Sequence, residues 1–134
     1  MVVKGILDLE DVKRAVDVAV DGIIVSNHGG RQLDGISSAV KVLTKIVDFV
    51  AGRLSVLVDG GVHSGLDVIK ILALGADAVL LGRARAFALA TGYELGAKHL
   101  LNVIQNEIRI ALALSGKKMM DEVDRNLLVN VPTV

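Results

Sequence analysis

The sequence contains no cysteine, no tryptophan and a single proline, and aromatic residues amount to only 2% of the chain. The absence of cysteine excludes disulfides and thiolate metal sites, which fits a reducing cytoplasm. Blocks of like charge are also missing, because fifteen basic and fifteen acidic side chains are interspersed and cancel. Nucleic acid and anionic membranes are therefore not expected as partners.

Long hydrophobic runs are missing as well. Glycine or a charged residue interrupts every apolar stretch well before the roughly 20 residues that a membrane helix needs. The apolar residues at positions 1–6 soon meet acidic residues and include no small-residue cleavage site, so a signal peptide is not expected. We expect a soluble, cytoplasmic protein without a membrane span.

What the chain does contain is a large apolar fraction, with 52% hydrophobic and 22% charged residues in a length of 134. These values are typical of one compact globular domain over residues 1–134. Four apolar runs, each followed by a polar or glycine-rich cluster, predict strands at residues 2–6, 22–26, 55–59 and 78–82. The runs are continuously apolar, which is typical of parallel strands that are covered on both faces.

Helical patterns alternate with these runs. They predict helices at residues 9–20, 37–51, 66–74 and 95–114, with Thr91-Gly92 as a connector before the last of them. After Met119 we expect a short helix and an irregular end at Pro132. Four βα units can form an open doubly wound sheet or half of an eight-stranded barrel. Polar residues follow the carboxyl end of every strand, as in a barrel that builds its site there.

The most informative segment is residues 22–35, where a buried strand leads into a polar loop that contains His28 and Arg31. Histidine titrates near neutral pH and can act as a base, and arginine can grip a carboxylate with two hydrogen bonds. The paired glycines between them allow a ligand to approach the backbone. The alternative is that His28 hydrogen-bonds a turn and Arg31 is a solvated surface charge.

This loop and its neighbours resemble the FMN-dependent 2-hydroxy-acid dehydrogenases and oxidases, a family that includes glycolate oxidase, lactate oxidase and L-lactate dehydrogenase of the flavocytochrome type. The motifs that carry the resemblance follow the family's order and spacing: Val2-Val3-Lys4-Gly5-Ile6, residues 26–34, Asp59-Gly60-Gly61-Val62 and residues 73–83. The resemblance implies a (β/α)8 TIM barrel. This chain is then its C-terminal half, with four βα units and a closing C-terminal helix.

The resemblance also implies FMN as the cofactor and a small L-2-hydroxy acid of the lactate or glycolate type as the substrate. Lys4 is then expected beside the flavin pyrimidine ring, where a cation stabilises reduced flavin. Ser26 is expected to hydrogen-bond the flavin, and Arg31 to bind the substrate carboxylate. His28 is expected to be the base, whether the substrate hydrogen leaves as a proton or as a hydride.

A phosphate site is expected where residues 59–65 leave a strand and enter a helix, because exposed N–H groups and the helix dipole favour an anion there. Gly82 and Arg83, after the fourth strand, add a backbone donor and a forked cation. The residues expected to bind the cofactor here are Asp59, Gly60, Gly61, His63, Gly82 and Arg83. At His63 the family usually has arginine, so FMN retention should be weaker and more dependent on pH. No metal site is expected.

The half of the barrel that is missing from this chain normally supplies a second arginine for the substrate and an aspartate that orients the catalytic histidine. An isolated half barrel leaves two strand edges open, so we expect a homo-oligomer or pairing with an N-terminal half barrel. Three interpretations remain at this point: part of a 2-hydroxy-acid-oxidising enzyme, a module that binds FMN or phosphate without turnover, and a self-associating structural remnant. Type 2 isopentenyl diphosphate isomerases are a rival family, which residues 26–31 disfavour.

Overall fold

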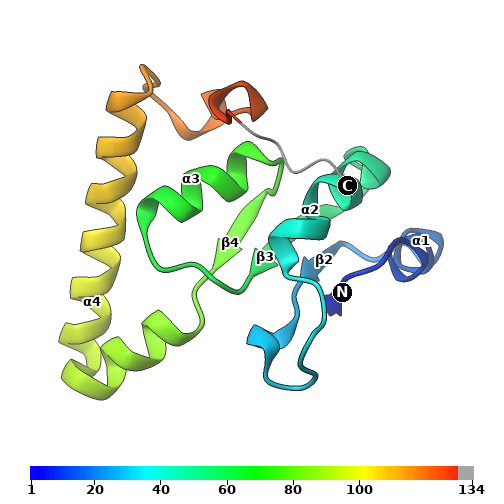
Figure 1. The fold of residues 1–134 in the computed structure, drawn as a ribbon, viewed down its shortest axis with the longest axis horizontal. Helices are drawn as coiled ribbons and strands as arrows, with labels where there is room; N and C mark the ends of the chain where they lie inside the picture. Colours follow the sequence, from blue (N-terminus) through cyan, green and yellow to red (C-terminus); the bar gives the residue numbers. More distant parts are fainter. Residues whose placement is uncertain (130–134) are drawn as a thin grey trace.

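The computed structural model describes residues 1–129, in which four strands alternate with four helices (Figure 1). The strands are β1 (Val2–Ile6), β2 (Gly22–Val25), β3 (Ser55–Asp59) and β4 (Ala78–Leu80). The helices are α1 (Leu9–Asp17), α2 (Ala39–Val50), α3 (Gly65–Ala73) and α4 (Arg83–Leu114). Three short 3-10 turns complete the set: η1 (His28–Gly30), η2 (Met120–Glu122) and η3 (Arg125–Leu127).

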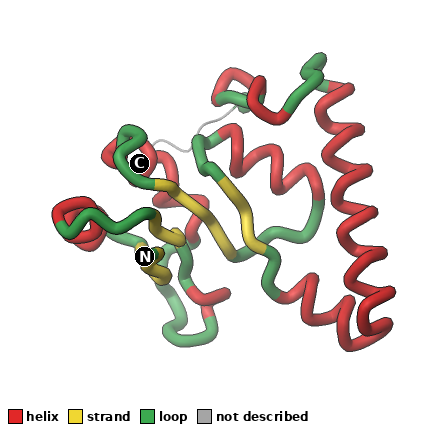
Figure 2. Tube along the Cα trace, turned by 180° about the vertical axis from the view of Figure 1, so that it is seen from behind, coloured by secondary structure: helices red, strands yellow, loops and turns green. Residues whose placement is uncertain are grey.

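The four strands form one parallel sheet in the order β1-β2-β3-β4. Each strand therefore lies beside its neighbour in sequence, and the order never reverses as it does in a doubly wound sheet. Since crossovers between parallel strands are right-handed, such an order places the connecting helices on one face of the sheet. Figure 2 shows the same sheet from behind. This topology is that of a barrel segment.

The core lies between the sheet and its helices. Alternate strand residues on this side are fully buried: Ile23, Val25, Val56 and Val58. They pack in one cluster with Val12, Leu43, Ile46 and Val50 from the helices. On the opposite face, Ile24 and Leu57 are only half-buried. The sequence predicted strands covered on both faces. Within residues 1–129 helices cover one face of the sheet, and the apolar residues of the other face are only partly covered.

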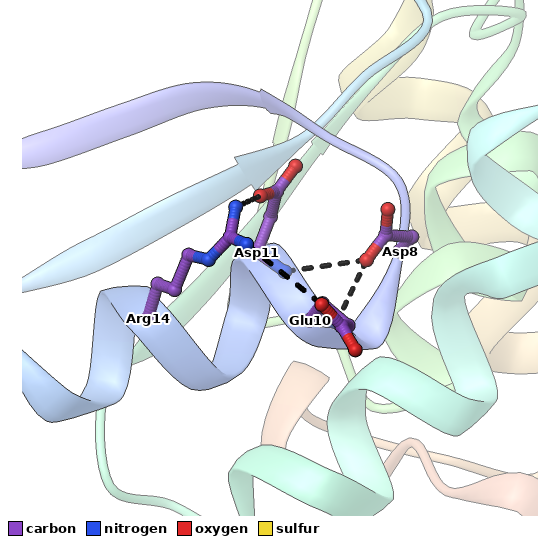
Figure 3. A network of polar contacts seen from close by, with 4 residues as sticks. All are labelled: Asp8, Glu10, Asp11 and Arg14. Atoms are coloured by element: carbon purple, nitrogen blue, oxygen red, sulfur yellow. Dashed lines mark hydrogen bonds and ion pairs between the residues drawn. The ribbon is translucent and has the colours of Figure 1, made fainter.

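The helix ends are set by local hydrogen bonds and backbone turns. At the start of α1, the Asp8 carboxylate accepts from the amides of Glu10 and Asp11 at 2.7 and 3.2 Å, and Arg14 pairs with Asp11 at 3.1 Å (Figure 3). The helix was expected to continue to residue 20, but it ends at Asp17 because Ala19 turns into the left-handed region at φ 53°.

The largest departure from the sequence-based prediction concerns α4. The helix begins at Arg83 and is broken at Gly92 and Tyr93, so a helical segment precedes the predicted one. The break coincides with the predicted connector, and Thr91 ends the first segment by donating from its hydroxyl to the Phe87 carbonyl at 3.0 Å. The predicted helix after Met119 consists of the two 3-10 turns. Pro132 lies outside the described residues.

Candidate functional site

The carboxyl ends of the strands meet at a cavity of about 410 Å³. Nine of the ten residues that the sequence nominated line it: Lys4, His28, Arg31, Asp59, Gly60, Gly61, His63, Gly82 and Arg83. The tenth, Ser26, lies outside the lining and is buried at 2% exposure. Nominated residues that are up to 79 positions apart in the sequence are thus gathered because parallel strands present their carboxyl ends at one edge of the sheet.

The loop after β2 presents His28 and Arg31. The Asn27 side-chain oxygen accepts from the Gly29 amide at 3.0 Å, and His28 adopts a left-handed conformation at φ 57°. This tight turn exposes both the His28 and the Arg31 side chains. Within residues 1–129 no hydrogen bond is made to the His28 imidazole. The ring is therefore placed at the cavity without a group that selects its orientation.

Ser26 is buried and forms hydrogen bonds with two of the cavity-lining residues. Its hydroxyl oxygen accepts from the Lys4 ammonium at 2.9 Å and from the His28 amide at 3.1 Å. The Lys4 ammonium also pairs with the Asp59 carboxylate at 2.5 Å. One buried hydroxyl therefore links β1, β2 and, through Lys4, β3, and it aligns the three strand ends on which the cavity is built.

Asp59 has one oxygen without a protein partner. Its Oδ2 atom pairs with Lys4, while Oδ1 is buried and has no hydrogen-bond partner within residues 1–129. A buried acceptor that is left unpaired costs about 1–3 kcal/mol. Asp59 lines the cavity, but this oxygen is itself covered by protein atoms, so the ion pair with Lys4 is the polar contact that the carboxylate makes there.

The glycines after β3 and β4 leave the backbone open toward the cavity. Gly61 has a φ of 73°, and a Cβ atom built on it or on Gly82 would meet nothing within 4 Å. Within residues 1–129 the amides of Gly61 and Val62 have no protein acceptor. Neighbouring amides of this kind can bind an anion without a side chain intervening.

The amides at the start of α3 are less available to a ligand than the sequence suggested. The amides of His63 and Ser64 were expected to be exposed, but both donate to the Asp67 carboxylate, at 3.0 and 2.9 Å. The Gly65 amide donates to Glu107 at 2.6 Å. Two carboxylates of the chain itself thus occupy the positive end of this helix, since Asp67 completes a capping box with Ser64. The free donors lie earlier in the loop.

The start of α4 is open instead. Within the described part of the chain no side chain caps its first turn, which begins beside Gly82 at the cavity. Arg83 and Arg85 both line the cavity, together with Lys4 and Arg31. Among the described lining residues only Asp59 carries a negative charge. A chain with no net charge therefore concentrates positive charge at this one place, which suits an anionic ligand.

Comparison with known proteins accounts for this arrangement. The family described as FMN-dependent dehydrogenase matches residues 1–130. This chain belongs to that family. FMN is accordingly the cofactor that the family indicates, as the sequence predicted.

The curated relatives are considerably longer than this chain. An L-lactate dehydrogenase of Caulobacter sp. (strain K31) is 53% identical over 128 residues, which cover 96% of this chain and 34% of the relative. An L-lactate dehydrogenase of Pseudomonas paraeruginosa (strain DSM 24068 / PA7) is also 53% identical and is covered to the same 34%. The chain thus spans about a third of the length of the curated relatives it matches.

Solved structures agree with the fold. Mandelate oxidase with benzoyl-formic acid superposes with a TM-score of 0.89 at 49% identity, over 92% of this chain and 37% of that one. The prediction of a (β/α)8 TIM-barrel fold is confirmed, and this chain covers only part of the barrel.

Several residues at the site were not nominated from the sequence. Gly29, Val62 and Ala86 line the cavity without having been nominated, whereas Arg85, also in the lining, was expected from the sequence to compensate in part for His63. Glu107 contacts Gly65, just after the site loop, from a position 42 residues later in the chain, and no local motif signals that contact. Within residues 1–129 no cluster of three or more histidine and acidic side chains is arranged to hold a metal ion. No helix in the same range has the length and apolar character to cross a membrane.

Proposed function

We propose that this chain carries the base, the carboxylate-binding arginine and the phosphate site of an FMN-dependent enzyme that oxidises a small L-2-hydroxy acid to the 2-oxo acid. The observation that carries the proposal is the convergence of His28, Arg31 and the glycine loops on one cationic cavity. The relatives' names supply candidate substrates, since they are L-lactate dehydrogenases and a mandelate oxidase.

The residues fit FMN at three points. The amides of Gly61 and Val62 and the guanidinium of Arg83 suit a phosphate. Gly61 and Gly82, where a Cβ atom would meet nothing within 4 Å, leave room for the phosphate to approach the backbone. The cavity also presents the Lys4 ammonium, which suits the electron-rich end of a flavin. When bound, FMN would accept the two electrons that leave the substrate.

His28 and Arg31 have different roles toward the substrate. Arg31 binds the carboxylate through its forked N–H groups and so orients the hydroxyl-bearing carbon. Oxidation of a 2-hydroxy acid to a 2-oxo acid releases two electrons and two protons, and the His28 imidazole takes up one of these protons. Both side chains extend from the same short turn, η1 and the residue after it, so their separation is set by the backbone.

His28 is also the reason to expect that another segment takes part. Within the described residues its imidazole has no carboxylate partner to select a tautomer. In the same range β1 and β4 each pair with one strand only, and one sheet face is incompletely covered. We propose that residues 1–134 are the C-terminal half of the barrel, and that an N-terminal half, or a second copy, pairs with the open strands.

The same observations favour a second candidate function, in which the chain by itself binds FMN without turnover. The absorption spectrum of the purified chain, before and after addition of FMN, tests both functions. A chain that stays colourless and takes up no added FMN would contradict both functions. Bound FMN that is bleached by L-lactate, glycolate or (S)-mandelate without oxygen supports the oxidising function, and bound FMN that none of them bleaches supports the binding function.

Two histidine variants test the base. His28→Ala should keep the yellow colour and lose the bleaching, because the proton then has no acceptor. His99→Ala is the matched control, since His99 is an exposed residue of α4 outside the cavity lining, and it should bleach like the parent. If the His28→Ala protein bleaches at the rate of the parent, His28 is not the base.

A further inference from the structure

The closest approach of α4 to the site loops is at Gly65, the first residue of α3. The Gly65 amide donates to the Glu107 carboxylate at 2.6 Å. A Cβ atom on Gly65 would lie 2.5 Å from the Ile108 nitrogen and 2.6 Å from the Ile104 oxygen. The backbones of α3 and α4 are therefore in direct contact, and this hydrogen bond is enclosed between them.

The contact lies three residues from the amides that suit a phosphate. Val62 is 4% exposed and belongs to the hydrophobic core. Gly65 is buried against α4, and Asp67 holds the amides of His63 and Ser64 between them. Residues 62–65 are thus anchored at both ends. Any shift of Gly65 is transmitted to the Val62 amide and to the His63 side chain, which lines the cavity.

Helix α4 contacts both the cavity and the start of α3. Its first residue, Arg83, lines the cavity directly. The break at Gly92 and Tyr93 then changes the direction of the helix, and the second segment passes the start of α3 (Figure 1). There Glu107, which lies outside the cavity lining, accepts the hydrogen bond from the Gly65 amide. One helix thereby relates the position of the Arg83 guanidinium to that of the glycine-loop amides.

We infer that Glu107 is a positioning residue for the FMN phosphate: through Gly65 it fixes the direction of the Gly61 and Val62 amides relative to Arg83. The Glu107 carboxylate does not touch the phosphate. It accepts the Gly65 amide, so that this donor is satisfied by the protein and the loop cannot rotate it toward the ligand. The inference rests on the proposed function, because it takes FMN to be the ligand of this cavity.

The test compares FMN with riboflavin, which lacks the phosphate, in flavin fluorescence titrations of the full chain. Glu107→Ala leaves a buried donor unpaired and frees the loop, and it should raise the Kd for FMN about tenfold. The Kd for riboflavin should stay within about twofold, because riboflavin makes no phosphate contacts. Glu107→Gln keeps an acceptor oxygen and should restore most of the FMN affinity. Glu94→Ala is the control, because Glu94 is exposed on the same helix.

The outcomes separate the inference from its alternatives. Equal weakening of FMN and riboflavin binding would mean that Glu107 only stabilises the fold, and unchanged binding of both would remove its role altogether; either result overturns the inference alone. A parent chain that binds no FMN overturns the proposed function and the inference with it. If Glu107→Ala does not fold, Glu107→Asp, which withdraws the carboxylate by one methylene, should show the same selective loss, and its absence would be equally decisive.

Discussion

Replacing Gly65 by alanine should destabilise the chain strongly, although alanine is the better helix former. The added Cβ would lie 2.5 Å from the Ile108 nitrogen, 2.6 Å from the Ile104 oxygen and 2.6 Å from the Glu107 Cβ. Two of these atoms belong to the α4 backbone and cannot rotate away. Helices α3 and α4 must therefore separate, and the hydrogen bond from Gly65 to Glu107 is stretched or lost.

The magnitude follows from three contributions. Overpacking at a close contact costs about 1–3 kcal/mol, and an unpaired buried amide costs about 1–3 kcal/mol. Better helix propensity returns at most about 1 kcal/mol. The free energy of unfolding should therefore fall by about 3 kcal/mol, which moves a urea midpoint by about 1–2 M for a domain of this size.

Urea titration followed by far-UV circular dichroism measures this change. Gly92→Ala is the matched control, because Gly92 has a negative φ and its Cβ would meet nothing within 4 Å. Its unfolding free energy should stay within about 0.5 kcal/mol of the parent value. A Gly65→Ala protein that is equally close to the parent would refute the direct backbone contact between α3 and α4.

Three further predictions concern the site loop and the C-terminal segment. Burial by itself raises the pKa of Asp67, but hydrogen bonds from the His63 amide and from Ser64 outweigh it and bring the pKa below its ordinary value of 3.8. The stabilisation is then complete above about pH 4 and is lost as the pH falls through the lowered pKa, so Asp67→Asn should reduce the melting temperature at pH 7 and much less below pH 3. His63→Arg should bind FMN more tightly, because a guanidinium can hold a phosphate with two hydrogen bonds; equal FMN affinities of the parent and the variant in fluorescence titrations would contradict this. Arg125→Ala removes the ion pair with Asp48 at 2.6 Å and should cost about 0.5–1 kcal/mol, detected as faster proteolysis after residue 117 with little change in FMN affinity.

The strand positions could be predicted because buried parallel strands have a strong local signature. The apolar runs at residues 2–6 and 55–59 are strands over their full predicted lengths. The ends of helices were less predictable, since α1 stops where Ala19 adopts a left-handed conformation that no sequence pattern required. No helix was predicted between the motif at Gly82-Arg83 and the connector at Thr91-Gly92, whereas α4 begins at Arg83.

The candidate site divides in the same way. The nominated residues follow strand ends, and parallel pairing alone brings strand ends to one edge, so their convergence was predictable from local sequence. Which backbone amides of residues 59–65 can donate to a ligand was not predictable from local sequence. An amide is available only if no protein group accepts its hydrogen bond, and that depends on which segments pack against it. The amides of His63 and Ser64 donate to Asp67, a neighbour in sequence. The Gly65 amide donates to Glu107, which lies on a helix far away in the sequence.

The sequence by itself determined the alternation of strands and helices, the family motifs and the chemical groups placed at the strand ends, because these depend on local composition and spacing. Only the tertiary structure decided the sheet order, which excludes a doubly wound fold, and the burial of Ser26 beneath Lys4 and His28. It also decided that Glu107 of α4 accepts from the amide of Gly65, the first residue of α3. These features depend on contacts between segments that are far apart in the chain. Such contacts stabilise the protein only once the segments have packed together, so local sequence does not reveal them.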